Sequence, residues 1–563
     1  MSWTRQKRDE QLLSQENGWR KKVWGDNLKV CLVYPNVYRI GMANLGFQTV
    51  YRLLNDLPFC LCERAFFSSP GETDVPAEKR PVSLESGRQL KDFDIVAFAV
   101  PFENDYPHIL SILEQAGISL ETRLRDHSEP LVMAGGIAVT LNPEPLSSFI
   151  DLFLLGEAEE MLPEFAELYR DALGKGRERR ECLLDVQRGV AGAYVPQFYQ
   201  VSYKCDGTIE DMKPTEASLP RKIQRRWTRE ISSFTTEQII TTPAAEFSEL
   251  FLTEVSRGCR RGCRFCAAGF VYRPVRFRQM EVLEPSFDRG IAQGKKIGLL
   301  GTAVSDHPQL PELCRSVMEK GGCFALGSLR MDRLTSEMAR LLRESGVETV
   351  ALAPEAGTQR LRDVLHKGIS EDHIFHAVES LIREEIRQIR LYFMVGLPTE
   401  TETDIDGLIS LTKRIRHYSL QISQGKRPFK RIILSVNQFI PKPSTPFQWH
   451  PLEDIRIIKK KLLHIQKALR REGPVRVFHD LPKWNYIQTL LSLGDRRVGL
   501  VLLAVHKLGG NWSQALKSVN LNSDFYVYRQ KDLQETFPWD FIDHEIDKSF
   551  LLGEYRKSLA EIP

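Results

Sequence analysis

The 563-residue sequence contains no long apolar run and only a small excess of positive charge. No stretch approaches the roughly 18 to 20 uninterrupted apolar residues of a membrane-spanning helix. The opening residues, MSWTRQKRDEQLL, lack the apolar segment of a secretory signal, so we expect a cytoplasmic protein. A formal net charge of +4 over this length does not by itself indicate a nucleic-acid partner.

Cysteine is also sparse, with ten residues in the whole chain. This density is too low for a disulfide scaffold, and grouped cysteines in a reducing compartment more often bind metal. Cys259, Cys263 and Cys266 fall within eight residues of one another, so we expect the chemistry there. We interpret the seven scattered cysteines as ordinary buried residues: Cys31, Cys60, Cys62, Cys182, Cys205, Cys314 and Cys323.

What remains is the composition of an ordinary globular chain. Hydrophobic residues make up 42%, charged residues 27% and aromatic residues 9% of the sequence, which excludes disordered, collagenous and membrane classes. At roughly 100 to 200 residues per domain, the length indicates two to four domains.

The first part of the chain, residues 1–171, alternates short apolar runs with helix-length segments. This pattern predicts a doubly wound, Rossmann-like α/β domain with a parallel sheet covered on both faces. Ligands of such sheets bind beyond the carboxyl ends of the strands. The expected strands are LKVCLVYP, FDIVAFAV, PLVMAGG and DLFLLG.

Residues 172–248 predict a connector with a small β element, a hairpin that turns at Asp206 and Gly207. Residues 249–450 predict six β/α units that form a partial TIM-type barrel, with its site at the strand carboxyl ends. Residues 451–563 predict a helical C-terminal domain. The six barrel strands are expected at 249–256, 296–301, 323–328, 348–354, 388–396 and 431–439.

The segment EVSRGCRRGCRFCAAG follows the first of these barrel strands and has Cys-x3-Cys-x2-Cys spacing. Three thiolates on one loop hold three irons of a cubane [4Fe–4S] cluster and leave the fourth iron without a protein ligand. A zinc site is the alternative, with Cys314 or Cys323 as a fourth ligand. Four arginines near the thiolates are expected to surround the cluster with positive charge: Arg257, Arg260, Arg261 and Arg264.

At these residues the sequence resembles the radical S-adenosylmethionine (SAM) superfamily, whose signature is this cysteine loop with an aromatic residue, here Phe265, before the last cysteine. The resemblance implies that the amino and carboxylate groups of SAM bind the open iron. It also implies reductive cleavage of SAM to a 5′-deoxyadenosyl radical. Further residues implied to contact SAM lie at strand ends: Gly301, Thr302, Ser328, Arg330, Glu355 and Gly396.

The first domain resembles the cobalamin-binding domains found upstream of many radical SAM cores. The resemblance rests on the strand–loop segment ending at Gly41, the loop at Gly135 and Gly136, and LLGEAEE. Tyr38 occupies the position of the histidine that ligates cobalt from below. A neutral phenol is a poor metal ligand. Two outcomes therefore stay open: cobalamin binds without a lower protein ligand, or the domain keeps its fold without the cofactor.

The expected function is that of a radical SAM enzyme, with methylation of an unactivated carbon if cobalamin binds. The substrate and the catalytic residues beyond the cofactor sites are not assigned. Ferredoxin or flavodoxin is the expected electron donor. Two alternatives remain: a cobalamin-free rearrangement, oxidation or sulfur insertion, and a non-catalytic iron–sulfur protein that binds RNA or acts as a sensor. The basic helix RIIKKKLLHIQKALRR is a candidate RNA contact, although it is first of all typical of an amphipathic helix with a solvated basic face.

Overall fold

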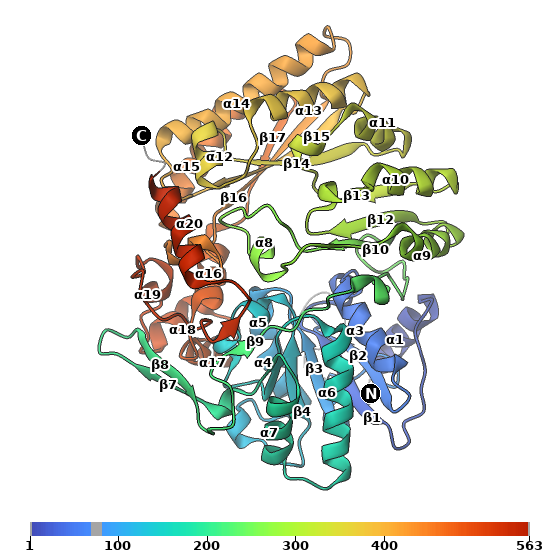
Figure 1. The fold of residues 1–563 in the computed structure, drawn as a ribbon, viewed down its shortest axis with the longest axis vertical. Helices are drawn as coiled ribbons and strands as arrows, with labels where there is room; N and C mark the ends of the chain where they lie inside the picture. The colour runs from blue at the N-terminus through green and yellow to red at the C-terminus, as the bar shows by residue number, and fades with distance from the viewer. Residues whose placement is uncertain (1–2, 69–80, 561–563) are drawn as a thin grey trace.

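A computed structural model describes residues 3–68 and 81–560. Two α/β layers are stacked along the long axis of the molecule, and the C-terminal segment runs along both of them (Figure 1). This architecture confirms the predicted fold class, whereas the predicted domain boundaries stay a prediction. In the described ranges no helix is both long enough and apolar enough to cross a membrane.

The first layer is a six-stranded sheet with the order β2-β1-β3-β4-β5-β6. All its neighbouring strands are parallel except β5 and β6. The order reverses between β1 and β3, which is where a doubly wound sheet opens a crevice. The strands are β1 (Leu28–Tyr34), β2 (Cys60–Phe66), β3 (Ile95–Ala99), β4 (Leu131–Gly135), β5 (Leu152–Leu154) and β6 (Ala193–Tyr194).

The sequence patterns missed strand β2 because two charged residues interrupt its apolar run. Glu63 and Arg64 are nevertheless buried. The Arg64 guanidinium donates to both carboxylate oxygens of Glu16, at 2.9 and 2.7 Å, and to Oε1 of Glu85 at 2.7 Å. Buried charges persist in a fold when they are paired in this way, so the partners of Arg64, which are distant in sequence, make this strand compatible with the sheet.

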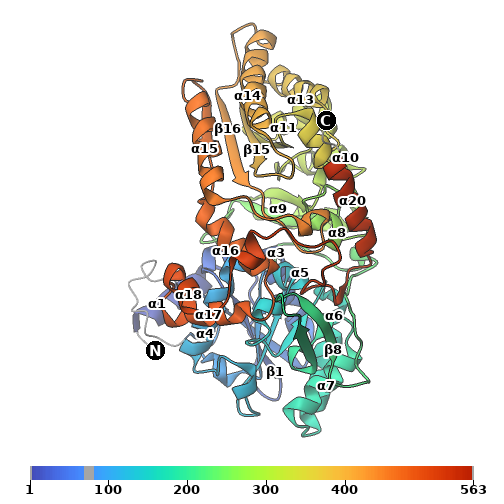
Figure 2. The same ribbon diagram turned by 90° about the vertical axis from the view of Figure 1, so that its left-hand side faces the viewer.

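Helices cover both faces of the first sheet. Right-handed crossovers place α3 and α4 on opposite faces, because strand order runs in opposite directions from β1 and from β3. Helix α3 contacts α6, and α4 contacts the C-terminal helix α17 (Figure 2). The helices are α1 (Trp3–Gln15), α2 (Tyr38–Gly41), α3 (Leu45–Asp56), α4 (Tyr106–Ala116), α5 (Ile137–Leu141), α6 (Ala158–Gly174) and α7 (Arg179–Gly189).

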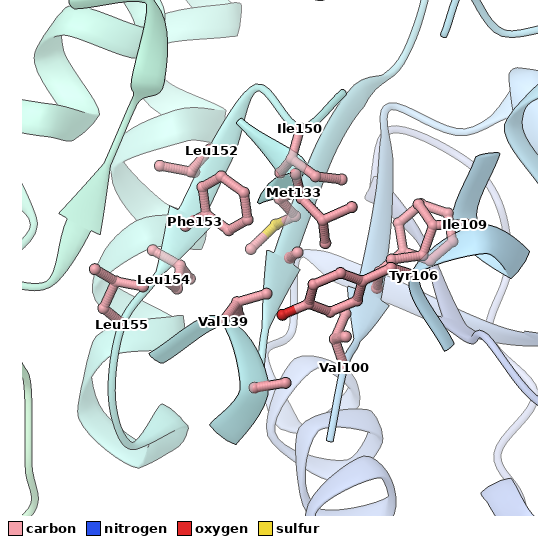
Figure 3. Packing of buried hydrophobic residues seen from close by; sticks show 14 of the residues in the cluster. Val100, Tyr106, Ile109, Met133, Val139, Ile150, Leu152, Phe153, Leu154 and Leu155 are labelled. Carbon is pink, nitrogen blue, oxygen red and sulfur yellow. The ribbon is translucent and has the colours of Figure 1, made fainter. Parts of the chain in front are cut away.

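The core of this layer is apolar and closely packed. Side chains from α4, β4, α5 and β5 converge in it, among them Tyr106, Met133, Val139 and Phe153 (Figure 3). All four are buried. The segment after this layer contains the predicted hairpin, since β7 (Tyr199–Tyr203) pairs antiparallel with β8 (Ile209–Pro214).

The second layer contains the six predicted parallel strands in two sheets, β11-β10-β12-β13 and β14-β15-β16-β17. An isolated parallel bridge between Leu329 and Leu352 connects the two sheets. The strands are β10 (Leu250–Arg257), β11 (Arg276–Phe277), β12 (Lys296–Gly301), β13 (Phe324–Leu326), β14 (Thr349–Glu355), β15 (Gln388–Val395), β16 (Arg431–Gln438) and β17 (Val475–Phe478). Its helices are α8 (Ala268–Val271), α9 (Met280–Ala292), α10 (Leu310–Glu319), α11 (Ser336–Glu344), α12 (Gln359–Val364), α13 (Glu371–Arg383) and α14 (Glu402–Ile422).

The C-terminal region is helical as predicted, but it is not a separate helical body. Strand β17 pairs parallel with β16, so α15 is one more crossover helix of the barrel. The later helices share one continuous core with the first layer. Helix α15 (Ile455–Leu469) packs in the barrel core, whereas the later helices are α16 (Pro482–Leu493), α17 (Val498–Lys507), α18 (Trp512–Ser518), α19 (Asp524–Val527) and α20 (Lys548–Ala560). The short strands β9 (Ile223–Gln224) and β18 (Ile542–Asp543) pair with each other.

Candidate functional site

The cysteine segment begins where β10 ends, on the side of the barrel that faces the first layer. Gly258 has φ +87°, and a Cβ there would lie 2.2 Å from the Tyr272 carbonyl oxygen. Only glycine fits so close an approach. The Cys266 N–H donates to the Cys263 carbonyl at 3.0 Å and closes the loop, after which α8 begins. Helix α8 lies between the two layers (Figure 1).

The three thiols lie close enough for their charges to interact. Burial raises the pKa of Cys266 to about 11, and the charges of Cys263 and Cys259 add to this increase. No group of three or more His, Cys, Asp or Glu side chains in residues 3–68 and 81–560 is arranged to hold a single metal ion. A cubane binds each thiolate through a different iron, so its ligands stand farther apart than the ligands of one ion.

Two predicted SAM-binding residues, Arg330 and Glu355, lie beside Cys263. Both influence the pKa of its thiol, which burial raises above its usual range and the charges of Lys367 and Arg330 lower. Lys367 Nζ donates to Glu355 Oε1 at 2.8 Å, and Arg330 Nη2 donates to the Lys367 carbonyl at 3.0 Å. The Lys367 ammonium also lies 5.9 Å from the centre of the Phe265 ring. Lys367 thus joins the cysteine loop to two strand ends.

Three of the four arginines predicted to surround the cluster are paired with protein carboxylates instead. These carboxylates offset the positive charge that the sequence predicts around the thiolates, and local sequence does not reveal them because they are distant along the chain. The pairs are Arg257 with Glu157, Glu159 and Glu254, Arg261 with Asp306 and Asp332, and Arg264 with Glu554.

The other predicted SAM-binding residues lie at separate strand ends. Gly301 ends strand β12 and Thr302 follows it; a Cβ at Gly301 would lie 2.3 Å from Ser256 Oγ. Ser328 follows β13 and is exposed. Gly396 is buried with φ +79°, and its N–H donates to Glu400 Oε1 at 3.0 Å. The backbone N–H of Gly396 therefore already has a protein partner.

A cavity of about 470 Å³ extends from the interior of the first layer to the cysteine side of the barrel. Apolar residues of β1, β3, β4, α3 and α6 line its lower part. At its upper end the predicted cobalamin loop, Gly135 and Gly136, and the predicted SAM loop, Gly301 and Thr302, line the same space. We call this space the interlayer cavity. Its upper wall is polar and is lined by Glu157, Arg225, Glu254, Ser256, Arg257 and Tyr272.

Two predicted cobalamin-binding residues, Tyr38 and Gly41, are not among the residues that line the interlayer cavity. The Tyr38 hydroxyl donates to Glu16 Oε1 at 2.6 Å, and its ring packs edge-on against Phe66 at 5.0 Å. Burial and the Glu16 charge raise the pKa of Tyr38 above its usual range. A Cβ at Gly41 would lie 2.6 Å from the Phe66 ring. Both residues therefore contribute to packing at the edge of the first sheet.

A buried ion network joins the two layers above the interlayer cavity. Glu157, which follows β5, accepts from Arg257 Nη1 at 2.9 Å and from both terminal nitrogens of Arg276, at 2.7 and 2.8 Å. The Thr228 N–H donates to the same carboxylate at 3.0 Å. These contacts hold the pKa of Glu157 below its usual range against the opposing effect of burial. Sequence patterns singled out Glu157 as part of a loop but not as a bridge between layers.

The basic helix proposed as an RNA contact is α15, and it is amphipathic. Ile458, Leu462 and Ile465 are buried against the barrel. Lys461 is not available to a partner, because its ammonium donates to Glu400 and Glu453 at 2.6 and 2.7 Å. The structure thus gives this helix a packing role in the barrel.

Comparisons with known proteins agree with these features. A model of radical SAM proteins, N-terminal, matches residues 46–196, and a model of the radical SAM superfamily matches residues 253–412. An uncharacterized protein of Methanocaldococcus jannaschii is 29% identical over 476 residues, covering 84% of this chain and 90% of that protein.

Two solved structures have partial similarity to this chain. The radical SAM methyltransferase TsrM from Kitasatospora setae, with cobalamin and a [4Fe–4S] cluster bound, has a TM-score of 0.48 and 15% identity, covering 87% of this chain and 97% of that one. The cobalamin-dependent SAM radical enzyme OxsB, with aqua-cobalamin bound, has a TM-score of 0.48 and 14% identity, covering 95% and 80%. The two matched family models and the cysteine loop at the mouth of a partial barrel show that this chain belongs to the radical SAM superfamily and is an enzyme whose cofactors are a [4Fe–4S] cluster and SAM.

Proposed function

We propose that Cys259, Cys263 and Cys266 bind the [4Fe–4S] cluster and that the enzyme cleaves SAM reductively to abstract hydrogen from an unactivated carbon. Bound to these thiolates, a reduced cluster would supply the electron that splits SAM into methionine and a 5′-deoxyadenosyl radical. Arg330 and Glu355 lie beside Cys263, where a charged and a polar contact orient the carboxylate and ribose of SAM.

We further propose that the interlayer cavity holds part of a cobalamin and that the reaction is a methyl transfer. Bound cobalamin would supply the methyl group. The observation that carries this proposal is that Gly135 and Gly136 line the same cavity as Gly301 and Thr302. A cofactor bound at the carboxyl-terminal edge of the first sheet would therefore share one continuous cavity with SAM.

The apolar lining of the cavity fits cobalamin, whereas the position of Tyr38 restricts how the cobalt could be ligated. The lower part of the cavity is deep and apolar, which suits an uncharged aromatic group such as dimethylbenzimidazole. Tyr38 is hydrogen-bonded to Glu16 and lies outside the lining, so it would not ligate cobalt. The proposal is thus cobalamin without a lower ligand from helix α2.

SAM cleavage tests the first part of the proposal. Anaerobically reconstituted protein, reduced by dithionite or by flavodoxin, should convert SAM to 5′-deoxyadenosine. Cys263→Ala should lose both iron and product, whereas Cys314→Ala, which alters a cysteine of the barrel core, should keep both. An intact cluster that yields no 5′-deoxyadenosine under either reductant would refute the proposed reaction.

Cobalamin binding tests the second part. Hydroxocobalamin should copurify with the reconstituted protein, as measured by cobalt analysis and visible absorption. Ala166→Leu narrows the cavity from α6 and should weaken binding at least ten-fold, while Ala172→Leu, at a buried position of the same helix outside the lining, should not. SAM cleavage without corrinoid binding would instead favour a cobalamin-free rearrangement, oxidation or sulfur insertion.

A further inference from the structure

Arg225 is a buried arginine at the upper wall of the interlayer cavity, and it forms no salt bridge with any residue that the structure describes. It follows strand β9, lines the cavity and is 1% exposed. Its backbone N–H donates to the Asp543 carbonyl at 2.9 Å, and its Nη2 donates to the Arg273 carbonyl at 2.9 Å. Its Nε and Nη1 are buried and have no hydrogen-bond partner within residues 3–68 and 81–560. The side chain is held in place while most of its donors are unused.

Three other arginines, of which Arg257 lines the same wall and the other two pair with carboxylates that line it, are different. Arg257 pairs with three carboxylates, Arg276 pairs with Glu157, and Arg278 pairs with Glu254. Arg225 forms no ion pair with any carboxylate of the described ranges. An unpaired buried charge is costly, so buried charges are normally paired or bind a ligand. The ion network therefore leaves one guanidinium beside the cavity without a carboxylate in direct contact among the described residues; the charges of Glu157 and Glu545 act on it only from farther away.

Other polar groups at this place are also unpartnered. The Ser256 hydroxyl lines the cavity and is buried without a hydrogen bond to any described residue. His544 directly follows the Asp543 carbonyl that fixes Arg225, and neither of its ring nitrogens has a partner in the part of the chain that the structure describes. A single hydrogen bond to the Arg273 carbonyl does not need a guanidinium, because any neutral donor would make it. These groups together point to a missing acceptor.

We propose that Arg225 binds a singly charged oxyanion, a phosphodiester or a carboxylate, of the molecule that occupies the interlayer cavity. The planar guanidinium presents paired N–H donors that match the oxygens of either group. The inference rests on the proposed function only in that it takes this cavity as a ligand site. The ligand would thus carry an anionic group, bound at the upper wall, in addition to an apolar part.

Small anions test the site without any cofactor. Inorganic phosphate should raise the unfolding temperature of the apo protein by about 2 °C or more, and Arg225→Met should abolish this shift. Arg225→Lys keeps the charge as a folding control and should retain part of the shift. Without phosphate, Arg225→Met should unfold at the wild-type temperature or above it. Arg276→Met removes an arginine that is paired with Glu157 of this wall, and it should unfold at a lower temperature.

Two corrinoids then identify the source of the anion. Hydroxocobalamin carries a phosphodiester in its nucleotide tail, and dicyanocobinamide lacks it. If that phosphodiester is the ligand, Arg225→Met should weaken cobalamin binding at least ten-fold and leave cobinamide binding unchanged. If the anion belongs to the substrate, both corrinoid affinities stay unchanged while the phosphate shift still requires Arg225.

The two proposals fail in different ways. Wild-type protein that binds neither corrinoid would refute the cobalamin proposal, and the phosphate measurement would still decide the role of Arg225. Equal phosphate shifts in wild type, Arg225→Met and Arg225→Lys, together with a loss of stability in Arg225→Met as large as in Arg276→Met, would overturn the anion site and leave Arg225 a structural residue.

Discussion

The Glu157 carboxylate lies 2.9 Å from the Arg257 guanidinium and joins the end of a strand in the first layer to a residue two positions before Cys259. Side-chain exposure is 4% for Glu157 and 11% for Arg257, so solvent does little to screen the pair. This ion pair holds the carboxyl-terminal edge of the first sheet in place relative to the cysteine loop. The interlayer cavity lies between the two.

Glu157→Gln should therefore lower the free energy of unfolding by about 3 kcal/mol, because it leaves Arg276 without its carboxylate partner. Chemical denaturation followed by circular dichroism measures the loss. Glu160→Gln removes a charge three residues away that pairs with Arg226 at the surface, and it should cost less than about 1 kcal/mol. Equal losses for the two variants would contradict the structural role of Glu157.

Gly258→Ala should prevent the cysteine loop from closing. A Cβ there would lie 2.2 Å from the Tyr272 carbonyl oxygen in a left-handed conformation, so backbone must move. We expect loss of the bound iron and destabilisation by about 3 kcal/mol or more. Gly294→Ala is the matched control, since φ is +68° there and no atom lies within 4 Å; it should cost about 1 kcal/mol and leave the iron content unchanged. Iron analysis after reconstitution separates the two outcomes.

Glu355→Gln should raise the KM for SAM about ten-fold with a smaller effect on kcat. Glu355 lies beside Cys263 and is held by Lys367 Nζ at 2.8 Å, where a charged hydrogen bond to SAM is expected. Initial rates of 5′-deoxyadenosine formation give both constants. Glu371→Gln, at the N-terminus of α13, should change neither of them. An unchanged KM in Glu355→Gln would remove Glu355 from the SAM site.

Asp105 should make stability fall as pH rises from about 4 to 7. Burial raises the pKa of this carboxyl to about 7, the Asn36 amide opposes the increase and the Glu103 charge adds to it; His108 Nδ1 lies 3.8 Å away. In this pH window the folded protein holds a proton that the unfolded chain has lost, so stability present below pH 4 is lost by pH 7.

Asp105→Asn removes this titration. Relative to wild type, its free energy of unfolding should increase between pH 4 and pH 8 by on the order of 3 kcal/mol. Urea denaturation at both pH values measures the change. Asp288→Asn, which alters an exposed carboxylate paired with Lys320, should show no such change. Parallel pH profiles for Asp105→Asn and wild type would show that Asp105 titrates as an exposed carboxyl.

Much of the architecture followed from local patterns. Continuous apolar runs such as those of β1 and β3 predict buried parallel strands, because nearly every side chain of such a strand meets a helix-covered face. Strand β17 was not predicted, because its four residues form a strand only through their pairing with β16 and have no strand pattern of their own. Strand β2 was not predicted because residues elsewhere in the chain make its charges tolerable: Glu16 pairs with Arg64, and the Trp24 N–H donates to Glu63.

The sequence by itself determined the two α/β layers, the cysteine spacing and the glycines that let the loop fold, because these depend on short-range geometry. Only the tertiary structure decided which charges are neutralised. In the folded chain Arg257 pairs with Glu157, Tyr38 is hydrogen-bonded to Glu16, and Arg225 has no ion pair with a described residue at the cavity. Such outcomes depend on residues tens to hundreds of positions apart that meet in a low-dielectric interior, where pairing outweighs local preference.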